Sequence, residues 1–409
     1  MAEQTTKQVT LIDGTVIDVR PLKISLLKPF MKRFQELSDV SDNNDESMNV
    51  LLDCVEIAFK QYVKEEVGVF TVNYLQILHA DQPILKTEES LFFINTTCIP
   101  THDLVKQIDQ LKEGEKLVSA SGKWIATCSK ERNLANILLA IYKPINYASA
   151  QFINDPIHLL QLHASFIKRD YQWIKENRKS SAIHSSNRVI QPDQIFIEEG
   201  ATVLCSNLNA TEGPIYIGKE AIVMEGASIR GPFVLGEKGV VKMNTSIYGS
   251  TTIGPACIAG GEIKNSILMG YSNKGHEGYL GDSIIGYWCN LGAGTCNSNI
   301  KNTAGSIQMW NEAKQIWDTI GQKMGMLVGD YSRFAIQSSI NTGSYIGVSA
   351  NIFGNGLLPK NIPNFTWGVL PGYQFEKVIE DLQNWKKLKG STISEEEQQI
   401  LLHLHHLSA

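Results

Sequence analysis

No stretch of this 409-residue chain approaches the ~20 apolar residues that a helix needs to cross a bilayer, so the sequence predicts no membrane partner. The N-terminus lacks the apolar core of a signal peptide, which favours a cytoplasmic protein. A formal charge of −5 lacks the basic excess that is typical of nucleic-acid binding. The seven cysteines are odd in number and never spaced as CxxC, which favours buried thiols over disulfides.

An apolar residue returns at every sixth position along much of residues 217–352. Helices repeat at 3.6 residues and flat strands at 2, whereas a solenoid with three short strands per coil explains a repeat of six. Gly often follows the apolar residue, which suits corners that need a positive φ or a missing Cβ. The sequence therefore predicts a left-handed parallel β-helix. The repeating residues are Ile217, Val223, Ile229, Leu235, Val241, Ile247 and Ile253, then Ile285 and Leu291, and then Val328, Phe334, Ile340, Ile346 and Ile352.

The sequence pattern divides the chain into four segments. Residues 1–69 begin like a strand and continue with helical patterns at 24–38 and 46–62, and residues 70–185 mix apolar runs with helical ones, as α/β regions do. The β-helix is predicted for residues 186–370, and residues 371–409 are predicted to form helices that cap its open end. Residues 301–325 lack the six-residue repeat, so we expect them to loop out. Packing on a coil face explains Trp310 and Trp317 better than the alternative, in which they cover a groove.

Residues 260–302 break the repeat and are rich in reactive side chains. His276 is the only histidine of the predicted solenoid, and its flanking glycines predict a loop that leaves the coil. Imidazole titrates near neutral pH, which suits removal of a proton from an attacking amine or hydroxyl. Lysines suit a phosphate, and amides suit a carbonyl or a sugar hydroxyl. The candidates are Lys264 and Lys274 for the phosphate and Asn290 and Asn299 for the other groups.

Four motifs resemble a known enzyme family. They are SNRVIQPDQIFIEEGA at 186–201, GPIYIGKEAIVMEGASIRGPF at 213–233, GEIKNSILMGYSNKGHEGYLGDSIIGYWCNLGAGT at 261–295, and NIFGNG with FTWG near the end. On these motifs the predicted solenoid resembles the acetyltransferase half of the bifunctional UDP-N-acetylglucosamine pyrophosphorylase / glucosamine-1-phosphate N-acetyltransferase. The resemblance is to the divergent branch of Bacteroidetes-type bacteria, and it extends upstream to about residue 74.

The resemblance implies transfer of an acetyl group from acetyl-CoA to an amino-sugar phosphate, and a homotrimer with acetyl-CoA between neighbouring solenoids. It implies that His276 is the general base and that Lys264 and Tyr279 bind the sugar phosphate. Asn290 and Asn299 match substrate-pocket positions of the family.

This chain departs from the family pattern at two basic positions. Ser246 stands where well-studied members have a phosphate-binding Arg, and Lys242 is the candidate to supply the missing charge. The loop after Asn299 also differs, and Lys301 is a displaced candidate for its basic contact.

Two alternative functions stay open. The family's nucleotidyltransferase half opens with a glycine-rich loop around the nucleotide phosphates, but residues 1–70 contain none, and residues 7–62 resemble small phage tail-assembly chaperones. A Mg²⁺-dependent sugar-1-phosphate nucleotidyltransferase is therefore one alternative. The other is a β-helix that serves only as a trimerisation or binding scaffold, although His276, Lys264 and Tyr279 at the family's spacing argue against it.

No metal site is predicted from the sequence. A zinc carbonic anhydrase of the β-helix type needs three histidine ligands, and the predicted solenoid has one. His403, His405 and His406 fall at the end of a helical pattern, where interaction with the helix dipole explains them better than a metal does.

Overall fold

The computed structural model describes residues 7–10, 16–19, 90–131, 137, 140–153 and 155–408. By its contacts the chain divides into two compact units, Met1–Val72 with Asn133–Ala140, and Asn73–Arg132 with Ile141–Ala409. Strands β1 (Lys7–Thr10) and β2 (Val16–Val19) pair antiparallel, which confirms the strand-like start. The helices predicted at 24–38 and 46–62, and most of the stretch that resembles phage chaperones, lie outside the described residues.

The predicted α/β region contains a four-stranded sheet with helices. The strands lie in the order β3 (Leu91–Ile94), β5 (Trp124–Ser129), β4 (Glu115–Val118) and β6 (Lys143–Asn146). Helix α4 (His102–Asp109) begins where the Thr101 hydroxyl accepts the Leu104 N–H at 3.1 Å. Helix α6 (Pro156–Asn177) begins with Pro156, and Asp155 accepts the His158 N–H at 2.7 Å. Both helix starts therefore follow from local capping chemistry.

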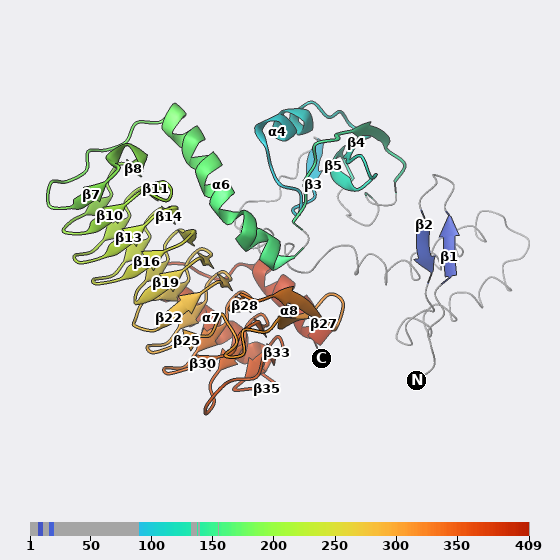
Figure 1. Ribbon diagram of the computed structural model, residues 1–409. Helices are drawn as coiled ribbons and strands as arrows, with labels where there is room; N and C mark the ends of the chain where they lie inside the picture. Colours follow the sequence, from blue (N-terminus) through green and yellow to red (C-terminus); the bar gives the residue numbers. More distant parts are fainter. Residues whose placement is uncertain are drawn as a thin grey trace, which may run out of the picture. The chain divides into compact units, whose positions relative to one another are not determined.

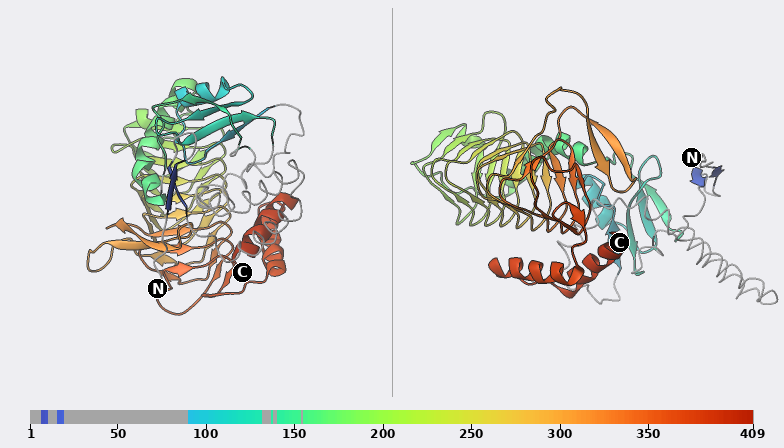
Figure 2. Two further views of the ribbon diagram at one scale, coloured as in Figure 1. Left: turned by 90° about the vertical axis from the view of Figure 1, so that its right-hand side faces the viewer. Right: turned by 90° about the horizontal axis from the view of Figure 1, so that it is seen from below.

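A left-handed parallel β-helix follows, as predicted (Figure 1). Its strands pair with their equivalents in the next coil, and the right-hand view of Figure 2 shows the coils stacked behind one another. Three parallel sheets result, which we call sheets 1, 2 and 3. Sheet 1 contains β7 (Arg188–Ile190), β10 (Asn207–Asn209), β13 (Ser228–Arg230), β16 (Ser246–Tyr248), β19 (Glu262–Lys264) and β22 (Tyr279–Gly281).

Sheets 2 and 3 extend through the later coils. Sheet 2 contains β8 (Ile195–Ile197), β11 (Ile215–Ile217), β14 (Phe233–Leu235), β17 (Thr251–Ile253), β20 (Ile267–Leu268), β23 (Ile284–Ile285), β28 (Met326–Val328), β31 (Ser344–Ile346) and β33 (Asn361–Ile362). Sheet 3 contains β9 (Thr202–Val203), β12 (Ile222–Val223), β15 (Val240–Val241), β18 (Ile258–Ala259), β21 (Asn273–Lys274), β24 (Asn290–Leu291), β29 (Arg333–Phe334), β32 (Asn351–Ile352), β34 (Thr366–Trp367) and β35 (Leu370–Pro371). A 3₁₀ turn at Pro192–Gln194 precedes β8.

The residues of the six-residue repeat form the solenoid core, and none of them exposes more than 4% of its surface. The reason for the glycines differs in part from the prediction. Gly218 lies where a Cβ would come within 2.7 Å of the backbone of Gly236 in the next coil. The positive φ of this corner belongs instead to Glu220, at 56°. Close stacking of coils, rather than backbone handedness, therefore requires glycine there.

The segment without the repeat forms an antiparallel hairpin of β26 (Ile307–Asn311) and β27 (Ile316–Gly321), which confirms that it leaves the coil. Trp310 and Trp317 face each other across the hairpin with ring centroids 5.6 Å apart, and Lys360 lies over the Trp317 ring. On either side of the hairpin in the sequence, β25 (Cys296–Asn297) and β30 (Ser339–Ile340) pair in parallel and continue the coil.

The C-terminal helices are confirmed as α7 (Phe375–Leu388) and α8 (Glu395–Ser408). They cover more than the last coil, because they pack along the corner between sheets 2 and 3, which is aromatic in the later coils. The buried corner residues are Tyr287, Trp288, Tyr331, Val348 and Phe365. The edge of sheet 3 is closed separately, by β35 folding back antiparallel on β34.

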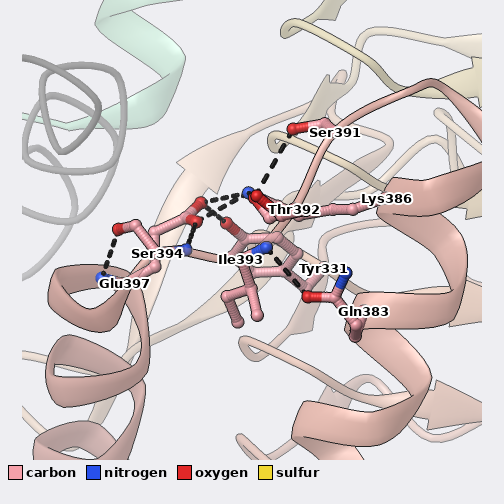
Figure 3. A network of polar contacts seen from close by, with 8 residues as sticks. All are labelled: Tyr331, Gln383, Lys386, Ser391, Thr392, Ile393, Ser394 and Glu397. Carbon is pink, nitrogen blue, oxygen red and sulfur yellow. Dashed lines mark hydrogen bonds and ion pairs between the residues drawn. The ribbon is translucent and has the colours of Figure 1, made fainter.

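A buried ion pair joins α7 to α8 (Figure 3). Lys386 donates to both carboxylate oxygens of Glu397 at 2.5 and 2.7 Å, and both residues are only 2% exposed. Tyr331 of the solenoid donates its hydroxyl to the same carboxylate at 2.7 Å. Glu397 also accepts the Ser394 N–H, while the Ser394 hydroxyl accepts the Glu397 N–H, which is a capping box. One carboxylate therefore ties both helices to the aromatic corner.

Helix α6 contacts sheet 2 through a buried histidine. His163 is 4% exposed, and its Nε2 lies 2.7 Å from the Thr252 hydroxyl. Burial lowers the pKa of His163 from 6.5 to about 4. Between these values the unfolded chain binds a proton that the folded chain does not, so the free energy of unfolding falls as the pH drops from 6.5 towards 4.

Substitution of His163 by Gln is expected to remove this pH dependence. In the wild type, His163 should cost about 2 kcal/mol of stability between pH 7 and pH 5, and the variant should lack that loss. Chemical denaturation of both proteins at the two pH values measures the difference, and subtraction cancels the other titrating groups. Equal losses in the two proteins would contradict the assignment.

Candidate active site

His276 lies on an exposed corner between β21 of sheet 3 and β22 of sheet 1. The corner, residues 275–278, has the same length as several others, so it is not the excursion from the coil that was predicted. The irregular corner belongs to the preceding coil, where only Gly260 and Gly261 connect β18 to β19. A Cβ on Gly260 would lie 2.6 Å from the carbonyl oxygen of Gly275, so the His276 corner packs closely on its neighbour.

Lys274 is buried beneath this corner, with 1% of its surface exposed. Its ammonium donates to the carbonyl oxygens of His276 at 2.5 Å and of Gly260 and Glu277 at 3.2 Å. Burial lowers the pKa of Lys274 to about 8, so the group is still largely charged at neutral pH. The prediction that Lys274 holds a phosphate is therefore wrong, because its three donors are used by the backbone. It positions the His276 corner instead.

Removal of the Lys274 ammonium is expected to loosen residues 275–278. Hydrogen bonds from a charged donor contribute about 1.5–3 kcal/mol. Lys274→Met should therefore lower hydrogen-exchange protection of the Glu262 and Gly294 amides, which donate to the carbonyl oxygens of Gly278 and Glu277, by about 10–100-fold. Lys242→Met is the matched control, because Lys242 is half-buried at the same edge of the solenoid. Unchanged protection in Lys274→Met, or an equal fall in both variants, would show that the ammonium does not hold the corner.

Three predicted residues gather on the outer face of sheet 1. Asn299 donates its amide to the Tyr279 hydroxyl at 3.1 Å. The Tyr279 hydroxyl lies over Gly281, where a Cβ would be 2.2 Å away from it, and Gly281 is the register partner of Lys264. Burial, followed by the charge of Asp282, raises the pKa of Tyr279 to about 12. The phenol therefore stays protonated at neutral pH and can donate to an anion beside Lys264.

The same face holds polar residues that the sequence analysis did not assign to the site. Lys264 Nζ lies 5.7 Å from the ring centroid of Tyr248, whose hydroxyl donates to Glu262 at 2.6 Å. Asn299 also donates to Asp282 at 2.5 Å. Tyr248 is in register with Lys264, 16 residues away. A regular coil of three six-residue repeats would place the partner 18 residues away, so the repeat alone does not identify Tyr248. The shorter spacing between the apolar residues of this coil is the sequence signal that does.

The remaining candidates lie elsewhere. Lys242 approaches the His276 corner, since its Cδ lies 3.9 Å from a Cβ placed on Gly275. Ser246 is exposed, and its register partner on β19 is Glu262. Asn290 is on sheet 3, where it accepts the Asn273 amide at 3.3 Å. Lys301 donates to the carbonyl oxygen of Ser306.

Neither a metal cluster nor a membrane span is found among the described residues. No group of three or more His, Cys, Asp or Glu side chains in that part of the chain is arranged to hold a metal ion. None of the described helices is both long enough and apolar enough to span a membrane.

Residues 55–179 match the family model for sugar nucleotidyl transferases. The chain is also 30% identical over 106 residues to the bifunctional protein GlmU of Methanocaldococcus jannaschii, a match that covers 26% of each chain. It is 32% identical over 168 residues to a bifunctional sugar-1-phosphate nucleotidylyltransferase/acetyltransferase of Sulfurisphaera tokodaii, covering 39% of this chain and 42% of that protein. The matches thus cover 26% and 42% of the lengths of these two relatives.

Two solved structures are weakly similar to part of this chain. The polysialic-acid-specific acetyltransferase NeuO is 14% identical, over 48% of this chain and 98% of that one, with a TM-score of 0.23. An Arabidopsis UDP-N-acetylglucosamine acyltransferase is 17% identical, over 56% and 94%, with the same TM-score. The fold assignment rests on the strand pairing described above. The chain therefore contains a stretch that matches sugar nucleotidyl transferases and a parallel β-helix, and it is similar in part to bifunctional enzymes named for nucleotidyl and acetyl transfer.

Proposed function

We propose that the protein is an N-acetyltransferase that moves the acetyl group of acetyl-CoA to an amino-sugar phosphate of the glucosamine-1-phosphate type. The observation that carries the proposal is the placement of an exposed histidine in the corner before β22, on the side of the solenoid that presents Lys264 of β19, Tyr279 of β22 and the nearby Asn299. The similarity to bifunctional GlmU proteins supports the same reaction. The assignment to a Bacteroidetes-type branch remains part of this proposal, as does the cytoplasmic location that these substrates require.

Phosphate binding is assigned to the Gly281 end of β22, and proton removal to the corner that precedes the strand. Lys264 and the Tyr279 phenol bind the phosphate of the acceptor, and Asn299 orients the phenol. His276, which precedes β22 in the chain, takes a proton from the acceptor amine as its nitrogen attacks the thioester carbonyl. A C–N bond forms, the C–S bond breaks, and the CoA thiolate leaves and is protonated. Lys274 fixes the backbone that carries the imidazole.

We also propose that the active form is a homotrimer. Asn290 is on sheet 3, whereas Lys264, Tyr279 and Asn299 are on the side of sheet 1, so one chain does not gather all four. A neighbouring copy can supply its sheet 3 to the sheet 1 site of the first, with acetyl-CoA between them. Sedimentation velocity of the full chain measures the mass, and a stable monomer at assay concentration would contradict the trimer.

Nucleotidyl transfer to a sugar-1-phosphate is the second candidate function, and the match of residues 55–179 favours it. Such a reaction would use Mg²⁺. No group of three or more acidic, His or Cys ligands is assembled among the described residues, and the first 54 residues lie outside the matched stretch.

One assay separates the two candidates. Purified full chain is mixed with acetyl-CoA and glucosamine-1-phosphate, and release of the CoA thiol is followed; UTP, Mg²⁺ and a pyrophosphate readout are then added. Thiol release without pyrophosphate supports the acetyltransferase alone. Pyrophosphate without thiol release supports the nucleotidyltransferase alone. Absence of both signals would favour a scaffold.

A further inference from the structure

Arg333 is a buried cation that the proposed reaction does not use. It begins β29 on sheet 3, between its register partners Asn290 and Asn351. Leu291 and Phe334, the neighbours of Asn290 and Arg333, point into the core, so these two polar side chains lie on the outer face of the sheet. Only 8% of Arg333 is exposed, which is rare for an arginine without a carboxylate partner.

One edge of the Arg333 guanidinium has no partner. Nη1 donates to the carbonyl oxygen of Tyr331 at 3.1 Å, and the ring of Trp385 on α7 lies 5.1 Å from the guanidinium carbon. Nε and Nη2 are buried, and within the described part of the chain neither has a hydrogen-bond partner. These two nitrogens form the edge of the guanidinium that donates two parallel hydrogen bonds to one carboxylate or phosphate.

The nearby acidic group is already engaged. Asp381 on α7 accepts the Tyr373 hydroxyl and lies 3.0 Å from the Lys377 ammonium. No ion pair joins it to Arg333 in the described structure. The other groups around Arg333 are amides, a second cation and two neutral groups. Asn273 bonds Asn290 on one side, and the Lys389 ammonium donates to Asn273 at 2.9 Å. The Tyr373 hydroxyl and the Cys289 thiol lie near the guanidinium. This environment favours an anion over a cation.

We propose that the Nε–Nη2 edge of Arg333, between Asn290, Asn351 and Trp385, binds a small oxyanion, either a phosphate or a carboxylate. The half-buried amides of Asn290 and Asn351 flank the edge and can donate to the same oxygens. Because Trp385 belongs to α7, the site lies where this helix packs against sheet 3. Within one chain the site is on sheet 3, whereas Lys264 is on sheet 1. Asn290 belongs both to this site and to the proposed trimer contact, but Arg333 takes no part in the proposed reaction.

Calorimetric titration of the full chain with inorganic phosphate, and separately with acetate at matched ionic strength, tests the site. The Lys264→Met background removes binding at the proposed substrate phosphate site. Binding of at least one of the anions should persist in that background. The affinity should weaken at least tenfold when Arg333→Lys is added, because lysine keeps the positive charge but lacks the two parallel N–H donors of the guanidinium. The anion that binds more tightly, phosphate or acetate, identifies the class of oxyanion that the site prefers. Arg230→Gln, an exposed arginine paired with Glu212, is the control and should change nothing.

A measurement on the unaltered protein covers the case in which an Arg333 variant does not fold. Crystals soaked in selenate should show an anomalous peak in contact with Nε and Nη2 of Arg333. Absence of binding in the Lys264→Met background would overturn the proposal, and so would binding that stays equally tight after Arg333→Lys is added. A soaked crystal with only water at that edge, or with an ion pair between Arg333 and Asp381, would overturn it as well.

Discussion

Replacement of His276 by alanine is expected to lower kcat for acetyl transfer by about 10²–10⁴-fold, the usual loss when a general base is removed. The fold should tolerate the change, because the side chain is exposed and lies outside the solenoid core. The backbone contact with Lys274 uses the carbonyl of His276 and survives the substitution. Steady-state rates of CoA release, at saturating acetyl-CoA and acceptor, measure the effect.

Two controls make this result specific to the imidazole. Glu225→Ala changes an exposed residue at the same corner of an earlier coil, and its rate should match the wild type. The thermal midpoint and the molecular mass of His276→Ala should also match, which separates lost chemistry from lost assembly. Wild-type turnover in His276→Ala would remove His276 from the mechanism, even if the reaction itself is correct.

Substitution of Lys386 by methionine is expected to destabilise the docking of α7 and α8 by about 3–5 kcal/mol, since it leaves the Glu397 carboxylate buried without its cation. The Tyr331 hydroxyl, whose pKa burial holds well above the usual value, still donates to that carboxylate and offsets only part of this cost. Hydrogen exchange of the α7 and α8 amides measures the free energy of opening.

Two further variants separate the contribution of the Lys386–Glu397 ion pair from the effect of removing any lysine charge on α7. Lys386→Met combined with Glu397→Gln removes both charges and should recover most of the lost stability, because the amide oxygen can still accept from Tyr331 and Ser394. Lys377→Met breaks an exposed ion pair on the same helix and should change little. A small effect of Lys386→Met alone would mean that Glu397 is solvated or protonated in solution.

The solenoid could be predicted because its signal is repeated and local. Each of the short strands in a coil must bury an apolar residue in the core. The six-residue repeat therefore recurs many times along the sequence. The start of α8 carried a signal of the same local kind, the Ser394–Glu397 spacing of a capping box, which the sequence analysis did not use.

The role of Lys274 could not be predicted, because a lysine is rarely buried and only the packing of three backbone carbonyls around it reveals its function.

The position of the C-terminal helices was missed for a different reason. The corner between sheets 2 and 3 changes from Lys219 and Glu220 in an early coil to Tyr287 and Trp288 in a later one. That change from charged to aromatic marks the surface that the helices cover, but it appears only after the coils are aligned.

The central claim is that this chain forms an amide on an amino-sugar phosphate, and transfer of a labelled acetyl group tests it most directly. The full chain is incubated with acetyl-CoA labelled with ¹³C in the acetyl group and with glucosamine-1-phosphate, and the product is examined by NMR. We predict ¹³C in an N-acetyl amide of the sugar phosphate, formed by the wild type and nearly absent with His276→Ala. Label found only in free acetate or unreacted acetyl-CoA would contradict the claim.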